Sequence, residues 1–224
     1  MIGALIALLL SWALLHFIEN QSLEVLGFRP TPRRLKLVGS AFLLTAVFMG
    51  GYYLAEAAGW RSPYHLNRAF SAGWLLSSLW TLLAGALFEE LLFRGALLYI
   101  LLRRIGPAKA VLVSAVAFGM YHWIIVGIHS LPQMTLLFLS MAWMGYALAR
   151  SFVVTGSILV PLALHFASNF IGADIFGDSS QLFVHAPGVH PSTIVVLLLL
   201  GMHNFAYPLV VLWWLKNLKI KKQL

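Results

Sequence analysis

Long stretches without a charged residue are the feature that most constrains this chain. Asp, Glu, Lys and Arg make up 10% of its 224 residues, against roughly 25% in a soluble domain. A helix needs roughly 20 apolar residues to cross a bilayer, and most of these stretches are about that long or longer. An ordinary soluble enzyme is therefore excluded. The charge-free stretches are Met1–Ile18, Leu37–Ala55, Ala69–Phe88, Ala110–Ala149, Ser151–Ala173 and Ser179–Leu215.

Helices rather than strands are expected in these stretches. Leu and Ala dominate them, and the alternation of polar with apolar residues over roughly ten positions that marks a transmembrane barrel does not occur. Lipid offers the backbone no hydrogen-bond partner, so each span must satisfy its own peptide groups. The sequence predicts an all-α, polytopic transmembrane helical bundle.

Seven spans are predicted, or eight if the long pattern at 69–105 is divided. That pattern would measure about 55 Å as one helix, whereas the hydrocarbon core is roughly 30 Å thick. We expect it to protrude or to bend at Gly85. The chain divides into N-terminal helices with a basic linker (1–68), a four-helix core (69–175) and an outer loop with the last helix and a basic tail (176–224). The predicted spans are Met1–Ile18, Leu37–Gly59, Ala69–Ile105, Ala110–Ile128, Pro132–Ala149, Phe152–Ile175 and Thr193–Leu215.

The basic residues indicate how these spans are oriented. The net charge is +8, but Lys and Arg cluster at span ends, so we expect no nucleic-acid partner. Seven spans put twelve basic residues on one side and only Arg61 and Arg68 on the other. By the positive-inside rule the C-terminus is cytoplasmic and the N-terminus is outside. The twelve are Arg29, Arg33, Arg34, Lys36, Arg103, Arg104, Lys109, Arg150, Lys216, Lys219, Lys221 and Lys222.

Two adjacent carboxylates stand inside the third span, where ionisable groups are costly and usually functional. Glu90 and Arg94 are four residues apart, so they share a helix face and can form an ion pair. Glu89 points about 100° away and has no partner on its own helix. A buried carboxylate without an ion-pair partner binds protons more readily, which makes Glu89 a candidate general base, with Glu90 and Arg94 as its scaffold.

Further polar pairs with helical spacing lie in later spans. His165 and Asn169 can offer hydrogen bonds to a common point, and the ring of Phe118 can form the wall of a pocket that holds His122. His203-Asn204 is a further pair, in the last span. Glu89, His122 and His165 each lie 13 to 15 residues from a basic residue at a predicted cytoplasmic span end, about 20 Å along a helix. We expect the three groups that contain Glu89, His122 and His165 to meet at one depth in the membrane.

At these positions the chain resembles the family of CAAX proteases and bacteriocin-processing enzymes, which are intramembrane proteases. The resemblance covers roughly residues 70–175 and leaves out His203-Asn204. It implies peptide-bond hydrolysis in the membrane, with Glu89 activating water together with His122, and His165 with Asn169 stabilising the oxyanion. The motifs are Phe88-Glu-Glu-Leu-Leu-Phe-Arg-Gly95, Phe118-Gly-Met-Tyr-His122 and Gly156-Ser-Ile-Leu-Val-Pro-Leu-Ala-Leu-His-Phe-Ala-Ser-Asn169.

The resemblance leaves the cofactor and the substrate open. Family members include metalloproteases and metal-free glutamate proteases. Glu89, His122 and His165 are the candidate ligands of a zinc ion, although no His-Glu-x-x-His helix is present. The expected partner is a membrane-associated protein or peptide, with or without an attached lipid, in the cell membrane. The alternatives are a proton-coupled transporter, disfavoured because the ionisable residues lack a counterpart in a second half-chain, and a family member that binds partners without cleaving them.

Overall fold

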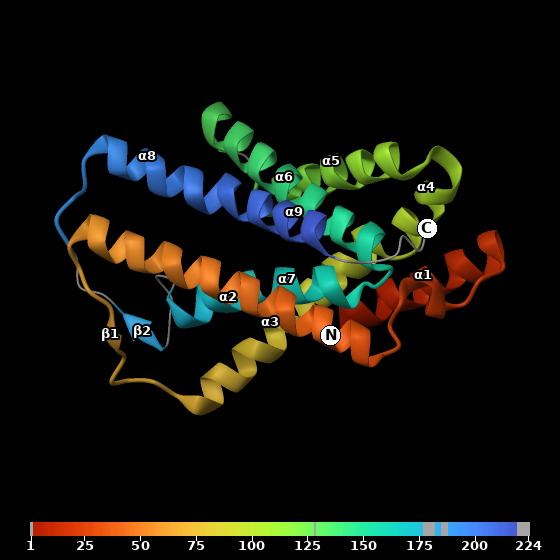
Figure 1. The fold of residues 1–224 in the computed structure, drawn as a ribbon, viewed down its shortest axis with the longest axis horizontal. Helices are drawn as coiled ribbons and strands as arrows, with labels where there is room; N and C mark the ends of the chain where they lie inside the picture. Colours follow the sequence, from red (N-terminus) through yellow and green to blue (C-terminus); the bar gives the residue numbers. More distant parts are fainter. Residues whose placement is uncertain (1, 128, 177–181, 185–187, 219–224) are drawn as a thin grey trace.

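The computed structural model describes residues 2–127, 129–176, 182–184 and 188–218. The described chain is a bundle of helices (Figure 1), as the composition predicts. Residues 177–181 and 185–187 of the predicted outer loop and the basic tail from 219 onward lie outside the described residues. The helices are α1 (Ile2–Glu19), η1 (Leu23–Leu26), α2 (Pro32–Trp60), α3 (Ala72–Arg94), α4 (Ala96–Ile105), α5 (Pro107–Val126), α6 (Leu131–Thr155), α7 (Leu159–Asn169), η2 (Phe170–Ile175), α8 (Thr193–Gly201), η3 (Met202–Ala206) and α9 (Tyr207–Asn217).

Five helices of the described part of the chain are long and apolar enough to cross a membrane: α1, α2, α5, α6 and the continuous segment Thr193–Asn217. The other two predicted spans fall on α3, which carries the charged residues, and on the shorter apolar segment Leu159–Ile175. Length and composition alone therefore support a multi-pass membrane protein and five of the seven spans.

The long pattern at 69–105 is broken, but not at Gly85 as predicted. Helix α3 ends at Arg94, and α4 starts at Ala96 in a new direction. Gly95 makes this break: a Cβ there would overlap the carbonyl oxygen of Leu91 and crowd the hydroxyl of Ser11 on α1. Gly85 lies inside continuous helix with open space around it. The close approach of α1, which no helical pattern reveals, locates the bend.

The predicted boundary between the spans 132–149 and 152–175 is also wrong. Helix α6 continues through Arg150 to Thr155, and Gly156 ends it in the left-handed conformation with φ 62°. The turn is anchored on the N-terminal linker, because the Ser157 hydroxyl donates to the carbonyl of Gly27 over 2.8 Å. Helix α7 therefore begins at Leu159, seven residues later than predicted.

The two ends of the bundle differ in their connections. At one end, β1 (His65–Leu66) pairs antiparallel with β2 (Phe183–Val184), and the end of α2 lies between this pair and the start of α8 in the view of Figure 1. At the other end lie the end of α1 and the α4–α5 turn. There the Glu19 carboxylate pairs with Arg103 at 3.1 Å and with Arg104 at 3.0 Å. Short α7 runs inside the bundle and packs against α2, α3 and α6.

Candidate active site

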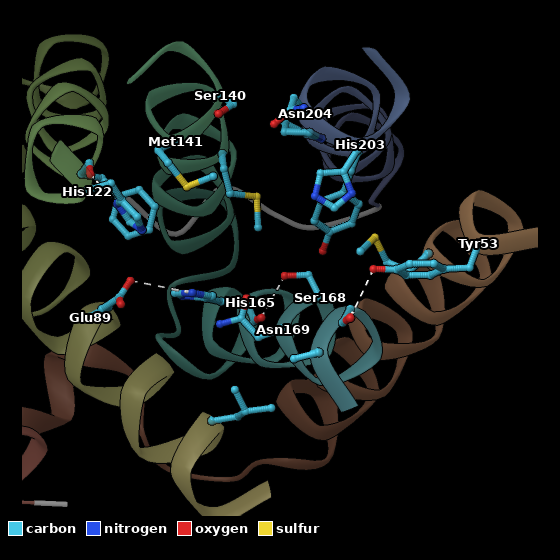
Figure 2. A pocket seen from close by; sticks show the side chains of 18 residues that line it. Tyr53, Glu89, His122, Ser140, Met141, His165, Ser168, Asn169, His203 and Asn204 are labelled. Carbon is cyan, nitrogen blue, oxygen red and sulfur yellow. Dashed lines mark hydrogen bonds and ion pairs between the residues drawn. The ribbon is translucent and has the colours of Figure 1, made fainter. Parts of the chain in front are cut away.

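A cavity of about 460 Å³ lies inside the bundle, and the predicted site residues line it (Figure 2). Glu89 comes from α3, His122 from α5, and His165 and Asn169 from α7. The fold thus brings together three motifs that are far apart in sequence. The lining residues are Met49, Tyr53, Leu82, Glu89, Phe118, His122, Ser140, Met141, Met144, His165, Ser168, Asn169, Gly172, Ala173, His203, Asn204, Tyr207 and Pro208.

Glu90 and Arg94 lie outside the cavity lining and are fully buried, with side chains 0% exposed. The predicted ion pair is present, with Arg94 Nη1 3.2 Å from Glu90 Oε1. Arg94 Nη2 also donates to the carbonyl of Gly145 on α6 over 3.0 Å, and the guanidinium lies 4.4 Å from the centre of the Phe118 ring. Arg94 therefore holds α3, α5 and α6 together.

His165 is oriented by Glu90, a contact that helix spacing did not predict. Its Nδ1 lies 2.8 Å from Glu90 Oε1, and its Nε2 lies 3.8 Å from Glu89 Oε2. Because a carboxylate paired with Arg94 accepts rather than donates, the proton of this hydrogen bond is on Nδ1. His165 can donate from Nε2 only as an imidazolium, and two carboxylates lie beside that charge.

Glu89 faces the cavity, with its side chain 18% exposed. Its Oε2 is buried and has no hydrogen-bond partner among the described residues. The prediction that Glu89 has no partner on α3 is correct, but His165 from α7 is its neighbour across the cavity. Glu89 Oε2 thus keeps its acceptor capacity beside the cavity, whereas Glu90 uses Oε1 for Arg94 and His165 and lies away from the cavity.

His122 is oriented by the backbone of its own helix. Its Nδ1 lies 2.8 Å from the carbonyl oxygen of Phe118, and the two rings are 4.5 Å apart between centroids. A carbonyl can only accept, so Nδ1 carries the proton and Nε2 of the neutral ring carries a lone pair. His122 therefore offers the cavity an acceptor, as Glu89 does.

Asn169 is the last residue of α7, one helical turn beyond His165, and lines the same cavity. The π-helical segment η2 follows it directly. Its amide has no side-chain hydrogen-bond partner in the part of the chain that the structure describes. An amide in this position can donate two hydrogen bonds to a ligand.

The predicted common depth rests on a count that the structure corrects. Glu89 is only five residues from the end of α3, and His165 is only six residues from the start of α7, because both predicted spans are broken. His122 is fifteen residues from the start of α5. All three side chains nevertheless line the same cavity.

The three motifs do not predict two features of the site. The carbonyl of Gly145, an acceptor for Arg94, carries no side-chain signal, although glycine is what lets α6 approach α5 here: a Cβ would lie 3.0 Å from the Cβ of Phe118. His203, outside the motifs, lines the cavity from η3. The sequence singles out His203 together with Asn204, because the pair lies inside an apolar span, but gives neither residue a role.

The candidate zinc ligands were tested against the geometry. His122 and His165 each use Nδ1 on a carbonyl or carboxylate, the arrangement that metal-binding histidines commonly have. However, the described residues contain no group of three or more His, Cys, Asp or Glu side chains that could hold one metal ion. The set Glu89, His122 and His165 therefore does not fit a metal centre in this arrangement.

Comparison with known proteins gives one match. Residues 71–171, which hold all three motifs, match the family described as type II CAAX prenyl endopeptidase Rce1-like. No curated protein and no solved structure matches the chain. The match lies within the core predicted at 69–175 and agrees with the resemblance carried by the motifs. Residues 71–171, a little less than half of the chain, are thus similar to the Rce1-like family of type II CAAX prenyl endopeptidases.

Proposed function

We propose that this protein is an intramembrane endopeptidase that hydrolyses a peptide bond of a membrane-associated protein or peptide. The observation that carries the proposal is the division of the cavity between acceptors and donors. Glu89 and His122 offer acceptor atoms, whereas Asn169 and a protonated His165 offer donors. Peptide hydrolysis needs both: acceptors orient and deprotonate water, and donors stabilise the oxygen that becomes negative.

The two acceptors match the two hydrogens of one water molecule. A water that donates to Glu89 and to His122 Nε2 turns a lone pair toward a peptide carbonyl in the cavity. As the water oxygen bonds to the carbonyl carbon, its proton passes to Glu89, which later gives that proton to the leaving nitrogen. Glu89 is thus base first and acid second.

The donors come from α7. When His165 is neutral, its single ring proton is on Nδ1, which donates to Glu90. Its Nε2 then has no proton to donate. When the ring carries its second proton, Nε2 donates as well, and Asn169 adds a second donor. Glu90 is therefore a positioning residue that holds the proton of His165 in place, and it does not touch the substrate.

We propose the cell membrane as the location, with the C-terminus in the cytoplasm, on the basis of the twelve-to-two distribution of basic residues. The chain has no cysteine, so single cysteines can report the topology. Ser130 and Asn217 are both exposed. Ser130 precedes the start of α6, which the predicted topology puts outside, and Asn217 is the last residue of α9, which it puts in the cytoplasm. Ser130→Cys should react with an impermeant reagent from outside and Asn217→Cys should not. Equal labelling of both would contradict this orientation.

The activity itself is tested by offering the purified protein, in detergent, a library of membrane peptides with and without attached lipid. Mass spectrometry of the products identifies the cleaved bond. Glu89→Gln should yield no products, while Glu24→Gln, the same change at an exposed carboxylate far from the cavity, should cleave at the wild-type rate. Cleavage by Glu89→Gln at the wild-type rate would overturn the assignment of the site.

A further inference from the structure

The polar groups of the cavity divide into those with partners inside the protein and those without. The Tyr53 hydroxyl donates to the carbonyl of Gly172, Ser140 to Leu137 and Ser168 to His165. The hydroxyl of Tyr207 lies 2.7 Å from that of Thr45 and donates to the carbonyl of Leu164. The Asn204 amide donates to the carbonyl of Leu200. These groups hold the walls together.

Few polar groups then remain for a ligand. Glu89, His122 Nε2, His165 Nε2 and Asn169 form the candidate catalytic set. The other is His203: neither ring nitrogen has a hydrogen-bond partner among the described residues. The His203 side chain is exposed and lines the cavity, and the few polar groups that line a ligand pocket are the ones that orient its ligand. Inside an apolar span a polar group without a partner is costly, so a ligand that accepts a hydrogen bond from it is favoured.

The backbone of the last helix turns His203 toward the cavity. It lies in the π-helical segment η3, which interrupts the helix between α8 and α9. Such insertions reorient side chains and are frequent at functional sites. Figure 2 shows His203 and Tyr53 on one side of the cavity and Glu89 with His122 on the other, with Ser168 and Asn169 between them.

An aromatic neighbour orients the ring of His203. The ring lies 5.0 Å from that of Tyr52 between centroids, tilted by 53° to it, and the Tyr52 hydroxyl in turn donates to Glu56 Oε1 over 3.3 Å. A neutral imidazole carries one N–H and one lone pair, so the oriented ring can donate one hydrogen bond into the cavity that it lines.

We propose that His203 is a substrate-positioning residue, whose ring N–H donates to a main-chain carbonyl oxygen of the bound peptide at the end of the cavity away from the scissile bond. This inference rests on the proposed function, because it takes the ligand to be a peptide. His203 lies outside the segment that matches the family. It adds to the reaction only through binding: the ring holds the peptide so that its scissile carbonyl meets Glu89.

The test uses a fluorescent copy of a peptide that the wild-type protein cleaves. His203→Phe keeps a ring against Tyr52 but has no nitrogen, and His203→Leu is a second variant without one. Losing one hydrogen bond should raise KM about 3- to 10-fold and leave kcat within about twofold. In the inactive Glu89→Gln background, the Kd of the intact peptide should rise by the same factor. His203→Gln, which can donate, should recover most of the binding.

The matched control is His16→Phe, since His16 also stacks on an aromatic ring, that of Trp12 at 5.5 Å, but lies on α1 outside the cavity. It should leave KM and Kd unchanged. Unchanged KM and Kd in both His203→Phe and His203→Leu would overturn the inference, as would a fall in kcat alone or a failure of Gln to restore binding. If the wild-type protein cleaves no peptide, the proposed function itself fails.

Discussion

Two regions that meet at the end of α3 place the adjacent carboxylates Glu89 and Glu90 in different surroundings. The inner cluster, formed by Glu90, Arg94 and the Gly145 carbonyl, is fully buried and held by an ion pair at 3.2 Å and a hydrogen bond at 3.0 Å, although Glu90 Oε2 and Arg94 Nε have no hydrogen-bond partner among the described residues. The cavity wall, formed by Glu89, His122 and Asn169, turns acceptor and donor atoms that have no partner among the described residues toward the cavity. His165 belongs to both, with Nδ1 on Glu90 and Nε2 toward Glu89. The comparison teaches that the buried ion pair can set the geometry of the site, and we propose that the chemistry takes place at the groups that face the cavity.

Breaking the inner cluster should have the largest effect on stability. Arg94→Ala leaves Glu90 as a buried charge without its ion-pair partner, and such a loss costs about 3–5 kcal/mol. The double variant Glu90→Ala with Arg94→Ala removes both charges and should be less destabilised than Arg94→Ala alone. Thermal unfolding in detergent measures this, with Arg33→Ala, an exposed arginine, as the control. Equal and additive losses would show that the two side chains do not act as a pair.

Removing a donor from the cavity wall should affect the rate and spare the fold. Asn169→Ala should lower kcat by about 100- to 1,000-fold, the typical cost of losing one oxyanion donor, without a large change in thermal unfolding. The control is Asn217→Ala, which removes an exposed amide side chain at the end of α9. A stability loss comparable to that of Arg94→Ala, with the rate per folded molecule unchanged, would move Asn169 to the structural side of the comparison.

A smaller loss of stability and rate is expected from a change at Gly145, where α6 packs closely against α5. In Gly145→Ala the added Cβ would lie 3.0 Å from the Cβ of Phe118 and 3.2 Å from the Cα of Ala115. Helix α6 must move away from α5, at a cost of about 1–3 kcal/mol. The same shift displaces the carbonyl that accepts from Arg94, so kcat should fall as well. Gly39→Ala, with open space around the Cβ, is the control. Wild-type stability and rate in Gly145→Ala would contradict this packing.

The sequence predicted the parts of this arrangement that follow from helical periodicity. The Glu90–Arg94 pair, the turn of Glu89 away from it and the shared face of His165 and Asn169 all depend on spacing within one helix. The family likewise followed from three local motifs. These features need no knowledge of how helices pack.

The remaining features depend on contacts between helices. The bend lies at Gly95 and not at Gly85 because Ser11 of α1 approaches there. Likewise α7 starts late because its turn docks on Gly27, 130 residues away from Ser157 in sequence. The hydrogen bond between Glu90 and His165 joins residues 75 positions apart. Periodicity within a single helix carries no information about contacts between residues so far apart in sequence. The position of His165 between Glu89 and Glu90 was therefore visible only in the fold.

The most direct test of the division between the two carboxylates is to make the same isosteric change at each. Glu89→Gln and Glu90→Gln are compared for peptide cleavage and for thermal unfolding in the same detergent. We expect Glu89→Gln to unfold at the wild-type temperature and to cleave nothing. We expect Glu90→Gln to unfold several degrees lower, because Arg94 loses its ion-pair partner. Cleavage by Glu89→Gln at the wild-type rate, or equal losses of stability in the two variants, would contradict the account.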